Sequence, residues 1–363
     1  MKILYDYQIF HMQKFGGISN YFYNLINNLN NNTKNNIEVF APLYINNYLD
    51  LLPKKIVKGI KINLNKIKLN YYVNDYLFNL KQNSFDPDIV HFTYYKIRNK
   101  KNKKSKYILT VYDMIHEQYP NYFYKDETTK EKKNACEYAD HIICISDNTK
   151  KKLIEKFHLP EKKISVTHLG ADHLDNTPNI ETVLKKNYIL YVGSRYGYKN
   201  FDNFLKSYSI NKNIHKYFDI VVFGGEKKIK DIQNEIKMSG VDIKKIHFLN
   251  GNEMILKNLY QNASLFVYPS LEEGFGIPPL EAMSQSCPVV ASNIAVFKET
   301  LDNACLYFNP NSIDDMSLKI ENVLKNKNEV IKLVDLGIQR KKLFTWKKCA
   351  EKTMEIYAKV LSR

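Results

Sequence analysis

The sequence predicts an α/β protein made of two parallel-sheet halves. Short apolar runs typical of buried strands alternate with segments of helical spacing along nearly all of the 363 residues, as in parallel sheets covered by helices. A chain of this length can form two domains, each with its own core. The polar residues 173–187 show no clear strand, so we expect a linker there, domains over 1–172 and 188–344, and a last helix over 345–363.

Composition limits the class of partner. The net charge of +16, from 54 Lys and Arg against 38 Asp and Glu, suits nucleic acid, an acidic membrane face or a phosphorylated ligand. Five cysteines without a C-x-x-C pair argue against a disulfide framework and for a reducing compartment. The first residues form a strand rather than a signal peptide, and no run approaches the roughly 20 apolar residues that span a bilayer. We therefore expect a cytoplasmic protein, either soluble or peripheral on a membrane.

The first half opens with a strand, a glycine pair and a helix. We expect a strand over Lys2–Tyr7 and a helix after Gly16-Gly17, capped by Ser19, because apolar residues then recur at helical spacing. A double glycine before a helix start can cradle an anion, since the first N–H groups of a helix are free and its dipole is positive there. A helix-capping turn explains the same residues equally well.

The rest of the first half alternates regularly. Strands are expected over 37–43, 88–92, 107–112, 140–145 and 164–168, and helices near 72–80, over 129–138 and from 146 to 157. Residues 96–106 are almost wholly basic. Such a run is either a solvated loop or a contact to anionic lipid headgroups, and it lacks the interleaved aromatic residues of single-stranded nucleic acid sites.

The second half begins with the compact apolar strand 188–192. The loop 193–200 follows, with Arg195 and Lys199 just before a helix. Arginine can bind two oxygens at once and lysine acts as a point charge, so this loop suits a diphosphate. Further strands are expected over 218–223, 246–249, 263–268, 288–292 and 304–308, and helices over 312–325, 328–342 and from the cap Thr345 onward.

The chain is organised around residues 269–283, between the strand 263–268 and a helix from Leu280. The connecting loop contains Gly274 and Gly276, which let the backbone approach a ligand closely, and the helix start offers free N–H groups. Glu273 lies in the loop and Glu281 in the helix. A carboxylate on each side of an anion-binding turn indicates a ligand with both phosphates and hydroxyls, such as a nucleotide sugar. A plain strand-to-helix turn with two solvated glutamates is the simpler alternative.

The order Glu273, Gly-Phe-Gly, Pro-Pro-Leu, Glu281 resembles the E-x7-E motif of glycosyltransferase family 4. These are retaining enzymes of the two-domain GT-B fold, which include mannosyl- and glucosyltransferases of glycan biosynthesis. The resemblance implies that Glu273 contacts the donor sugar in a catalytic role and that Glu281 binds the ribose hydroxyls. It also implies that the backbone of the intervening donor-binding residues holds sugar and phosphate: Gly274, Phe275, Gly276 and Ile277.

The resemblance covers nearly the whole chain and implies further site residues. Lys199 and Arg195 would bind the donor phosphates, and the loop of Gly16 and Gly17 would approach the diphosphate. Many family members have His-Asp where this chain has Tyr112-Asp113 at a strand's carboxyl end, where such sheets bind ligands. Asp113 would therefore be catalytic, orienting the acceptor hydroxyl or taking its proton, or else merely cap the next turn. The expected acceptor-side residues are His91, Tyr112 and His116.

Together these implications describe a retaining hexosyltransferase. It would move a hexose from a GDP- or UDP-sugar to a hydroxyl of a glycan or lipid-linked glycan, with the last helix crossing back to the first domain. No cofactor or metal is expected, because the sequence contains no His/Cys ligand cluster and the resemblance is to GT-B enzymes, which usually have no essential metal. A peripheral contact with an anionic membrane fits the charge, and no nucleic acid is expected. The alternatives are another nucleotide-sugar enzyme of this fold, or a basic protein that binds nucleic acid or membrane without catalysis.

Overall fold

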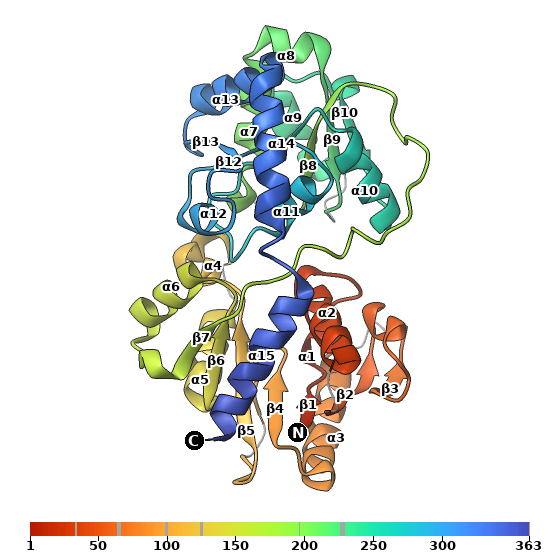
Figure 1. Ribbon diagram of the computed structural model, residues 1–363, viewed down its shortest axis with the longest axis vertical. Helices are drawn as coiled ribbons and strands as arrows, with labels where there is room; N and C mark the ends of the chain where they lie inside the picture. Colours follow the sequence, from red (N-terminus) through yellow and green to blue (C-terminus); the bar gives the residue numbers. More distant parts are fainter. Residues whose placement is uncertain are drawn as a thin grey trace. The chain divides into compact units, whose positions relative to one another are not determined.

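The computed structural model describes residues 1–32, 35–63, 67–98, 101–123, 126–195, 197–225 and 229–362. The chain forms two compact units (Figure 1). Unit 1 contains Met1–Leu169 and Trp346–Arg363, and unit 2 contains Gly170–Thr345. Both units are α/β structures with entirely parallel sheets, which confirms the predicted fold class.

The sheet of unit 1 has seven strands in the order β3-β2-β1-β4-β5-β6-β7. Their bounds are β1 Lys2–Tyr5, β2 Asn36–Tyr44, β3 Val57–Lys61, β4 Ile89–Phe92, β5 Lys106–Val111, β6 His141–Cys144 and β7 Ile164–Val166. The inner strand β1 pairs Ile3 with Ile37 of β2 on one side and with Ile89 of β4 on the other. The sequence did not predict β3, because this edge strand is mostly exposed and lacks an apolar run.

Helices surround this sheet (Figure 1). They are α1 Gln8–Met12, α2 Gly17–Asn32, α3 Ile67–Phe85, α4 Ile115–Gln118, α5 Thr128–Tyr138, α6 Asp147–Phe157 and α15 Trp346–Leu361, with 3-10 turns at Tyr48–Leu51, Pro120–Tyr122 and Glu161–Lys163. Ser146 caps α6, a helix predicted from residue 146, by accepting the N–H of Thr149. The cap predicted for α2 was wrong. Ser19 lies inside the helix, and its own N–H donates to Oε1 of Gln13 at 3.3 Å.

The last helix, α15, belongs to unit 1, where it packs against α2. Its Tyr357 hydroxyl lies in the core, 3.0 Å from the hydroxyl of Tyr5 in β1 and 2.5 Å from Nδ1 of His91 in β4. These contacts tie the end of the chain to the middle of the sheet. Unit 1 is therefore completed by a segment that follows unit 2 in the sequence.

The sheet of unit 2 has six strands in the order β10-β9-β8-β11-β12-β13. Their bounds are β8 Tyr188–Val192, β9 Asp219–Phe223, β10 Ile246–Leu249, β11 Leu265–Tyr268, β12 Val289–Ser292 and β13 Leu306–Phe308. The helices are α7 Phe201–Ser209, α8 Lys212–Tyr217, α9 Ile229–Ser239, α10 Glu253–Asn262, α11 Ile277–Ser284, α12 Ala295–Thr300, α13 Ile313–Lys325 and α14 Lys327–Lys341, with 3-10 turns at Gly197–Lys199 and Ile243–Lys245. The sequence did not predict α8, α9 or α12. Residues 170–187 contain no helix or strand.

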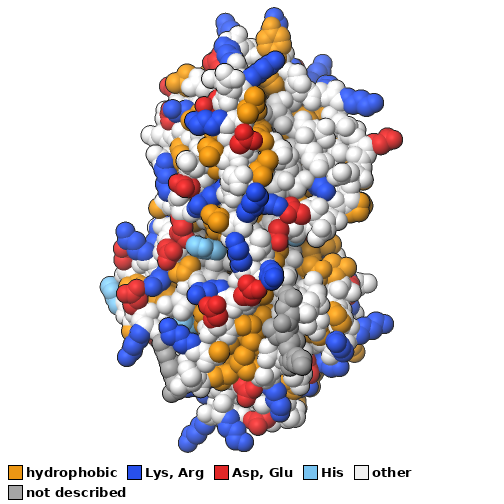
Figure 2. Space-filling model, in the orientation of Figure 1, with side chains coloured by type: hydrophobic (Ala, Val, Ile, Leu, Met, Phe, Trp, Pro, Cys, Tyr) orange, Lys and Arg blue, Asp and Glu red, His pale blue; other side chains and the backbone are white. Residues whose placement is uncertain are grey.

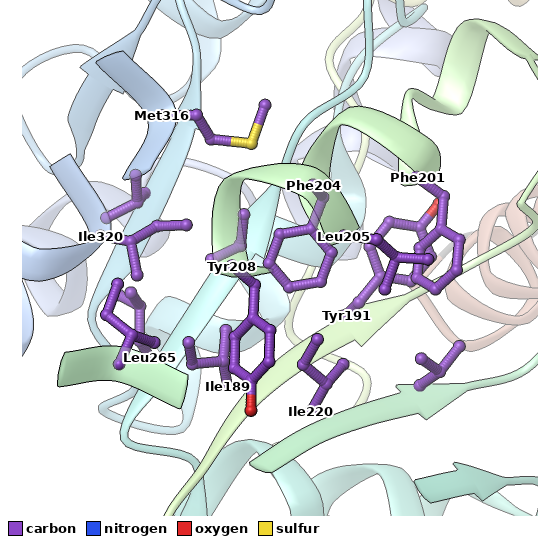
Figure 3. Close-up of a cluster of buried hydrophobic side chains, with 14 of the residues drawn as sticks. Ile189, Tyr191, Phe201, Phe204, Leu205, Tyr208, Ile220, Leu265, Met316 and Ile320 are labelled. Atoms are coloured by element: carbon purple, nitrogen blue, oxygen red, sulfur yellow. The ribbon is translucent and has the colours of Figure 1, made fainter. Parts of the chain in front are cut away.

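The core of unit 2 lies between α7 and the sheet (Figure 3). Phe201, Phe204 and Tyr208 of α7 recur at helical spacing and are buried in this core. The ring of Tyr191 in β8 lies 4.8 Å from that of Phe201 and 6.0 Å from that of Phe204. Aromatic pairs at these distances add about 0.5–1.5 kcal/mol beyond the area that they bury. This packing fixes the start of α7 and with it the loop that precedes it.

Basic and acidic side chains are interspersed on the face of the molecule shown in Figure 2. Four members of the basic run 96–106 pair with acids from elsewhere in unit 1: Lys96 with Glu131, Arg98 with Asp75, Lys101 with Asp140 and Lys104 with Asp86. Residues 99 and 100 of that run lie outside the described residues. Among the described helices, none is both long and apolar enough to cross a membrane.

The Tyr357 contacts generate a test of unit 1. We expect Tyr357→Phe to lower the free energy of unfolding of unit 1 by about 1–3 kcal/mol, because it leaves the buried Nδ1 of His91 without its partner. Urea unfolding followed by the fluorescence of the single tryptophan measures this, since Trp346 is buried in unit 1. Tyr122→Phe, at a tyrosine that is 52% exposed, is the control. Equal midpoints for the two variants would contradict the expectation.

Candidate active site

In unit 2 the residues singled out by sequence gather at the carboxyl edge of the sheet. The strand β11 ends at Tyr268, and α11 begins at Ile277 with prolines in its first turn. Gly276 precedes the helix at φ +95°, and a Cβ there would lie 2.8 Å from Cε1 of Phe297. Both the backbone angle and the lack of space therefore require glycine at this position.

The two central charged residues of this edge form one ion pair. Nζ of Lys199 donates to Oε1 of Glu273 at 2.6 Å, and the two side chains are only 16% and 10% exposed. The ring of Tyr268 lies 5.8 Å from the same ammonium group. Burial raises the pKa of Tyr268 well above its usual value, and the charge of Glu273 adds to this effect. The loop 193–200 and the loop 269–276 are thus joined by a cation and a carboxylate at the sheet edge.

Arg195 reaches the same edge from the end of β8. Its Nη1 donates to the carbonyl oxygen of Gly224 after β9 at 2.7 Å, and its guanidinium lies 5.5 Å from the ring of Phe248 in β10. A Cβ on Gly225 would lie 2.8 Å from the same Nη1. Gly225 therefore leaves room for the guanidinium, a role that sequence analysis did not assign.

Glu281 has two partners that sequence analysis missed. Its Oε2 accepts from the Tyr260 hydroxyl at 2.9 Å, and its Oε1 lies 3.1 Å from Nε2 of His173. Tyr260 comes from α10 and His173 from the segment 170–187. Nothing in the local pattern around either residue pointed to Glu281, because these contacts depend on how distant segments pack.

Burial lowers the pKa of His173, but its hydrogen bond to Glu281 and the charge of Glu281 raise it more, and the charges of Glu253 and Asp172 add to this. The net effect places the pKa of His173 above its ordinary value. The imidazolium form is therefore favoured beside Glu281.

In unit 1, Gly16 and Gly17 have different surroundings. A Cβ on Gly16 would lie 2.3 Å from Oε1 of Gln13, whereas a Cβ on Gly17 would meet nothing within 4 Å. Gly16 is thus explained by the side chain of Gln13, which also accepts the N–H of Ser19. Gly17, the first residue of α2, is exposed and has open space where a side chain would be.

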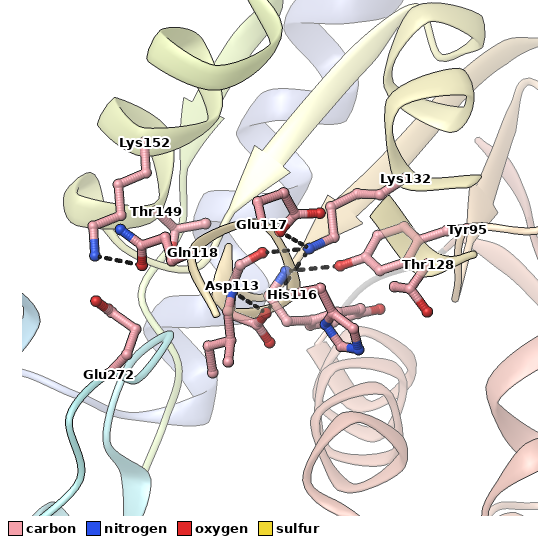
Figure 4. Close-up of polar contacts among 12 residues, drawn as sticks. Tyr95, Asp113, His116, Glu117, Gln118, Thr128, Lys132, Thr149, Lys152 and Glu272 are labelled. Carbon is pink, nitrogen blue, oxygen red and sulfur yellow. Dashed lines mark hydrogen bonds and ion pairs between the residues drawn. The ribbon is translucent and has the colours of Figure 1, made fainter. Parts of the chain in front are cut away.

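Asp113 follows β5 and is held by a buried ion pair (Figure 4). Nζ of Lys132 donates to the backbone oxygen of Asp113 at 2.9 Å and to Oε2 of Glu117 at 2.8 Å, and the side chains of Lys132 and Glu117 are both 1% exposed. Oδ1 of Asp113 accepts the N–H of Ile115 at 3.0 Å, while the side chain stays 27% exposed. Asp113 therefore caps the next turn with one oxygen and still presents a carboxylate to solvent.

The three residues predicted on the acceptor side, His91, Tyr112 and His116, differ in their exposure to solvent. His91 is fully buried, its Nε2 lies 2.8 Å from the Thr110 hydroxyl, and burial lowers its pKa to about 3. The ring is a neutral core residue, which contradicts the acceptor contact predicted for it. Tyr112 is 5% exposed and donates its hydroxyl to the Thr93 carbonyl at 2.7 Å, so it too lacks the access that an acceptor contact needs. His116 remains partly exposed, with Nε2 3.2 Å from Asp126.

Two parallel-sheet units, one with cations and carboxylates at its carboxyl edge, define a glycosyltransferase-like protein of the GT-B class. The Glycosyltransferase Family 4 model matches residues 15–173, and the Glycosyl transferases group 1 model matches residues 172–340. The chain belongs to the glycosyltransferases that these two models describe.

Characterised relatives agree with this class. The chain is 32% identical over 222 residues to the O-antigen chain mannosyltransferase RfbU of Salmonella typhimurium, a match that takes in 59% of this chain and 60% of RfbU. It is 29% identical over 264 residues to O-antigen chain mannosyltransferase B of Escherichia coli, over 69% of each chain. Among solved structures, HepE of Anabaena in complex with UDP and glucose superposes with a TM-score of 0.75 at 14% identity, covering 99% of this chain and 100% of HepE. The last likeness concerns the fold alone.

The pairing of His173 with Glu281 makes a prediction about pH. The folded-state pKa of His173 is raised, so the pair's contribution to stability is complete below the unfolded value of about 6.5 and is lost as pH rises through the folded-state pKa. We expect Glu281→Gln to lower the pKa of His173 below that of the wild type by at least about one unit. NMR titration of the histidine ring protons, with His173 assigned from His173→Gln, measures it. An unchanged pKa would show that the pair does not form in solution.

Proposed function

We propose that this protein transfers a mannosyl group from a nucleoside diphosphate sugar to a hydroxyl of a glycan acceptor. The observation that carries this proposal is the largely buried Lys199–Glu273 ion pair in the loops before α11, with Arg195 at the same edge of the sheet. Two cations and a helix start suit a diphosphate. A carboxylate next to them suits the hydroxyls of a sugar.

In this proposal Arg195 and Lys199 hold the donor phosphates. An ammonium group has three N–H donors, so Lys199 can keep its bond to Glu273 and still donate to a phosphate oxygen. When the bond between the sugar and the diphosphate breaks, negative charge grows on the leaving phosphate. Fixed cations and the positive dipole end at the start of α11 stabilise that charge without moving. Glu273 accepts hydrogen bonds from the sugar and orients its anomeric carbon.

The acceptor hydroxyl then forms the new bond to that carbon. We propose that Asp113 takes or directs its proton, because its carboxylate is partly exposed while the bonds of Lys132 and Ile115 hold it in place. We propose retention of the anomeric configuration, with attack from the face that the diphosphate leaves, in line with the E-x7-E resemblance. In line with the same resemblance, we propose that the loop of Gly16 and Gly17 takes part in donor binding.

The printed activities of the relatives favour mannose and a cell-surface glycan as acceptor, because RfbU and mannosyltransferase B are both O-antigen chain mannosyltransferases. The nucleotide is guanosine or uridine diphosphate, and HepE with bound UDP supports a nucleotide on this fold. Thermal stability of the purified protein against GDP, UDP and their mannose and glucose derivatives tests this, since a ligand that binds only the folded state raises the midpoint. No shift with any of them would overturn the proposed donor.

Substitution of the central pair tests the site. We expect Glu273→Gln or Lys199→Ala to lower the rate of transfer by about 100-fold or more, because each removes a charge from the site of bond cleavage. Transfer of labelled mannose measures this. The control is Lys206→Ala, which removes a lysine of the exposed pair with Asp202 on α7. Near-normal transfer by either site variant, with the fold intact, would reject the assignment.

The glycine pair after β9 offers a matched test of Arg195. Gly224 and Gly225 both have positive φ, at +78° and +85°, so alanine strains the backbone similarly at each position. Only Gly225→Ala places a Cβ against Nη1 of Arg195. We expect Gly225→Ala to raise the Kd for the nucleoside diphosphate about tenfold more than Gly224→Ala does, which is about 1.4 kcal/mol. Isothermal titration calorimetry measures both Kd values. Equal values for the two variants would reject the assignment of Arg195 to the donor phosphates.

A further inference from the structure

Glu281 is held at both carboxylate oxygens by residues from two other segments. The Tyr260 hydroxyl donates to Oε2 at 2.9 Å, and Nε2 of His173 lies 3.1 Å from Oε1. The side chains of Glu281 and His173 each keep 9% exposure. The carboxylate is therefore largely withdrawn from water but still accessible from one side.

The Glu281 carboxylate can accept further hydrogen bonds beyond the two that the protein supplies. An ionised carboxylate accepts at about four lone-pair positions, two on each oxygen. Among the described residues, Tyr260 takes one position on Oε2 and His173 takes one on Oε1. One position on each oxygen remains, so the carboxylate can still accept one hydrogen bond at each oxygen. This arrangement matches two hydroxyls on adjacent carbons of one ligand.

The segment that carries His173 is itself anchored. The N–H of Ala171 donates to the Phe344 carbonyl at 3.1 Å, and Lys341 pairs with Asp175. The Phe344 ring in turn lies 5.5 Å from that of Phe275, within the donor-binding loop. Although residues 170–187 contain no helix or strand, His173 is thus fixed on both sides, and it can fix the carboxylate that it touches.

We propose that His173 is a positioning residue that orients the Glu281 carboxylate for the vicinal 2′- and 3′-hydroxyls of the donor's ribose. This inference rests on the proposed function, since it requires a nucleoside diphosphate in unit 2. Tyr260 holds one oxygen and His173 the other, so rotation of the carboxylate about the Cγ–Cδ bond is restrained before the ligand arrives. Without His173, only the hydrogen bond from Tyr260 restrains the Glu281 carboxylate. Ordering the carboxylate when the ligand binds then costs conformational entropy.

A purely structural role for His173 predicts something different. If the His173–Glu281 pair only stabilised the loop, its loss would weaken every nucleotide equally. A positioning role predicts that the variant loses mainly the binding affinity contributed by the 2′- and 3′-hydroxyls of the ribose. The test is therefore a ratio: the Kd of a 2′,3′-dideoxynucleoside diphosphate divided by the Kd of the ordinary nucleoside diphosphate, measured by calorimetry on the full chain.

We expect a ratio of at least about tenfold for the wild type, because a charged acceptor loses two hydrogen bonds with the dideoxy ligand. We expect His173→Ala and Glu281→Gln each to reduce the ratio below about threefold, and the double variant to reduce it no further. His173→Gln keeps an N–H donor and should retain part of the ratio. Thermal midpoints without ligand show whether each variant is folded.

The matched control is His247→Ala. His247 also pairs with a carboxylate, Asp219 at 2.8 Å, but these residues start β10 and β9 at the amino edge of the sheet. This variant should leave the ratio unchanged. A ratio preserved in His173→Ala, or an equal loss of both ligands, overturns the positioning role. A wild-type ratio of one overturns it while leaving donor binding intact, and failure of either ligand to bind the wild type overturns the proposed function itself.

Discussion

A carboxylate that is withdrawn from water needs partners, and this constraint organises the active edge of unit 2. Glu273 and Glu281 are 9% and 6% exposed. Glu273 is paired with Lys199, and Glu281 with His173 and Tyr260. Breaking a buried pair by removing one partner costs about 3–5 kcal/mol. The loop after β8, the start of α11 and the segment 170–187 therefore hold one another in place through these charges, and the site is ordered before any donor binds.

The alternation of strands and helices could be predicted because each buried strand is a compact apolar run. Tyr188–Val192 and Leu265–Tyr268, for example, are buried at every position. Prediction failed where this signal is weak. β3 is an exposed edge strand with charged residues, and the cap of α2 comes from Gln13 rather than from the expected Ser19. A side chain outside the helix can supply a cap as well as a residue at its start.

The sequence could predict individual site residues from their type and motif, but not the contacts that those residues make with distant segments. Glu273 and Lys199 were both singled out, but their mutual bond joins two loops that meet only in the folded sheet. The partners of Glu281 gave no local signal at all. His91 shows the converse error. A histidine at the end of a strand resembles a site residue, yet its ring lies between Thr110 and Tyr357 of a helix at the far end of the chain, a contact that no local pattern contains.

The division of unit 1 into two pieces has a consequence for biosynthesis. Unit 2 is one continuous segment, Gly170–Thr345, whereas unit 1 also needs Trp346–Arg363. A ribosome delivers the chain from the N-terminus, and domains generally fold as units when complete. Unit 2 can therefore assemble its whole core while the seven-stranded sheet still lacks the helix that carries Tyr357. The half of the protein that is made first is the half that finishes last.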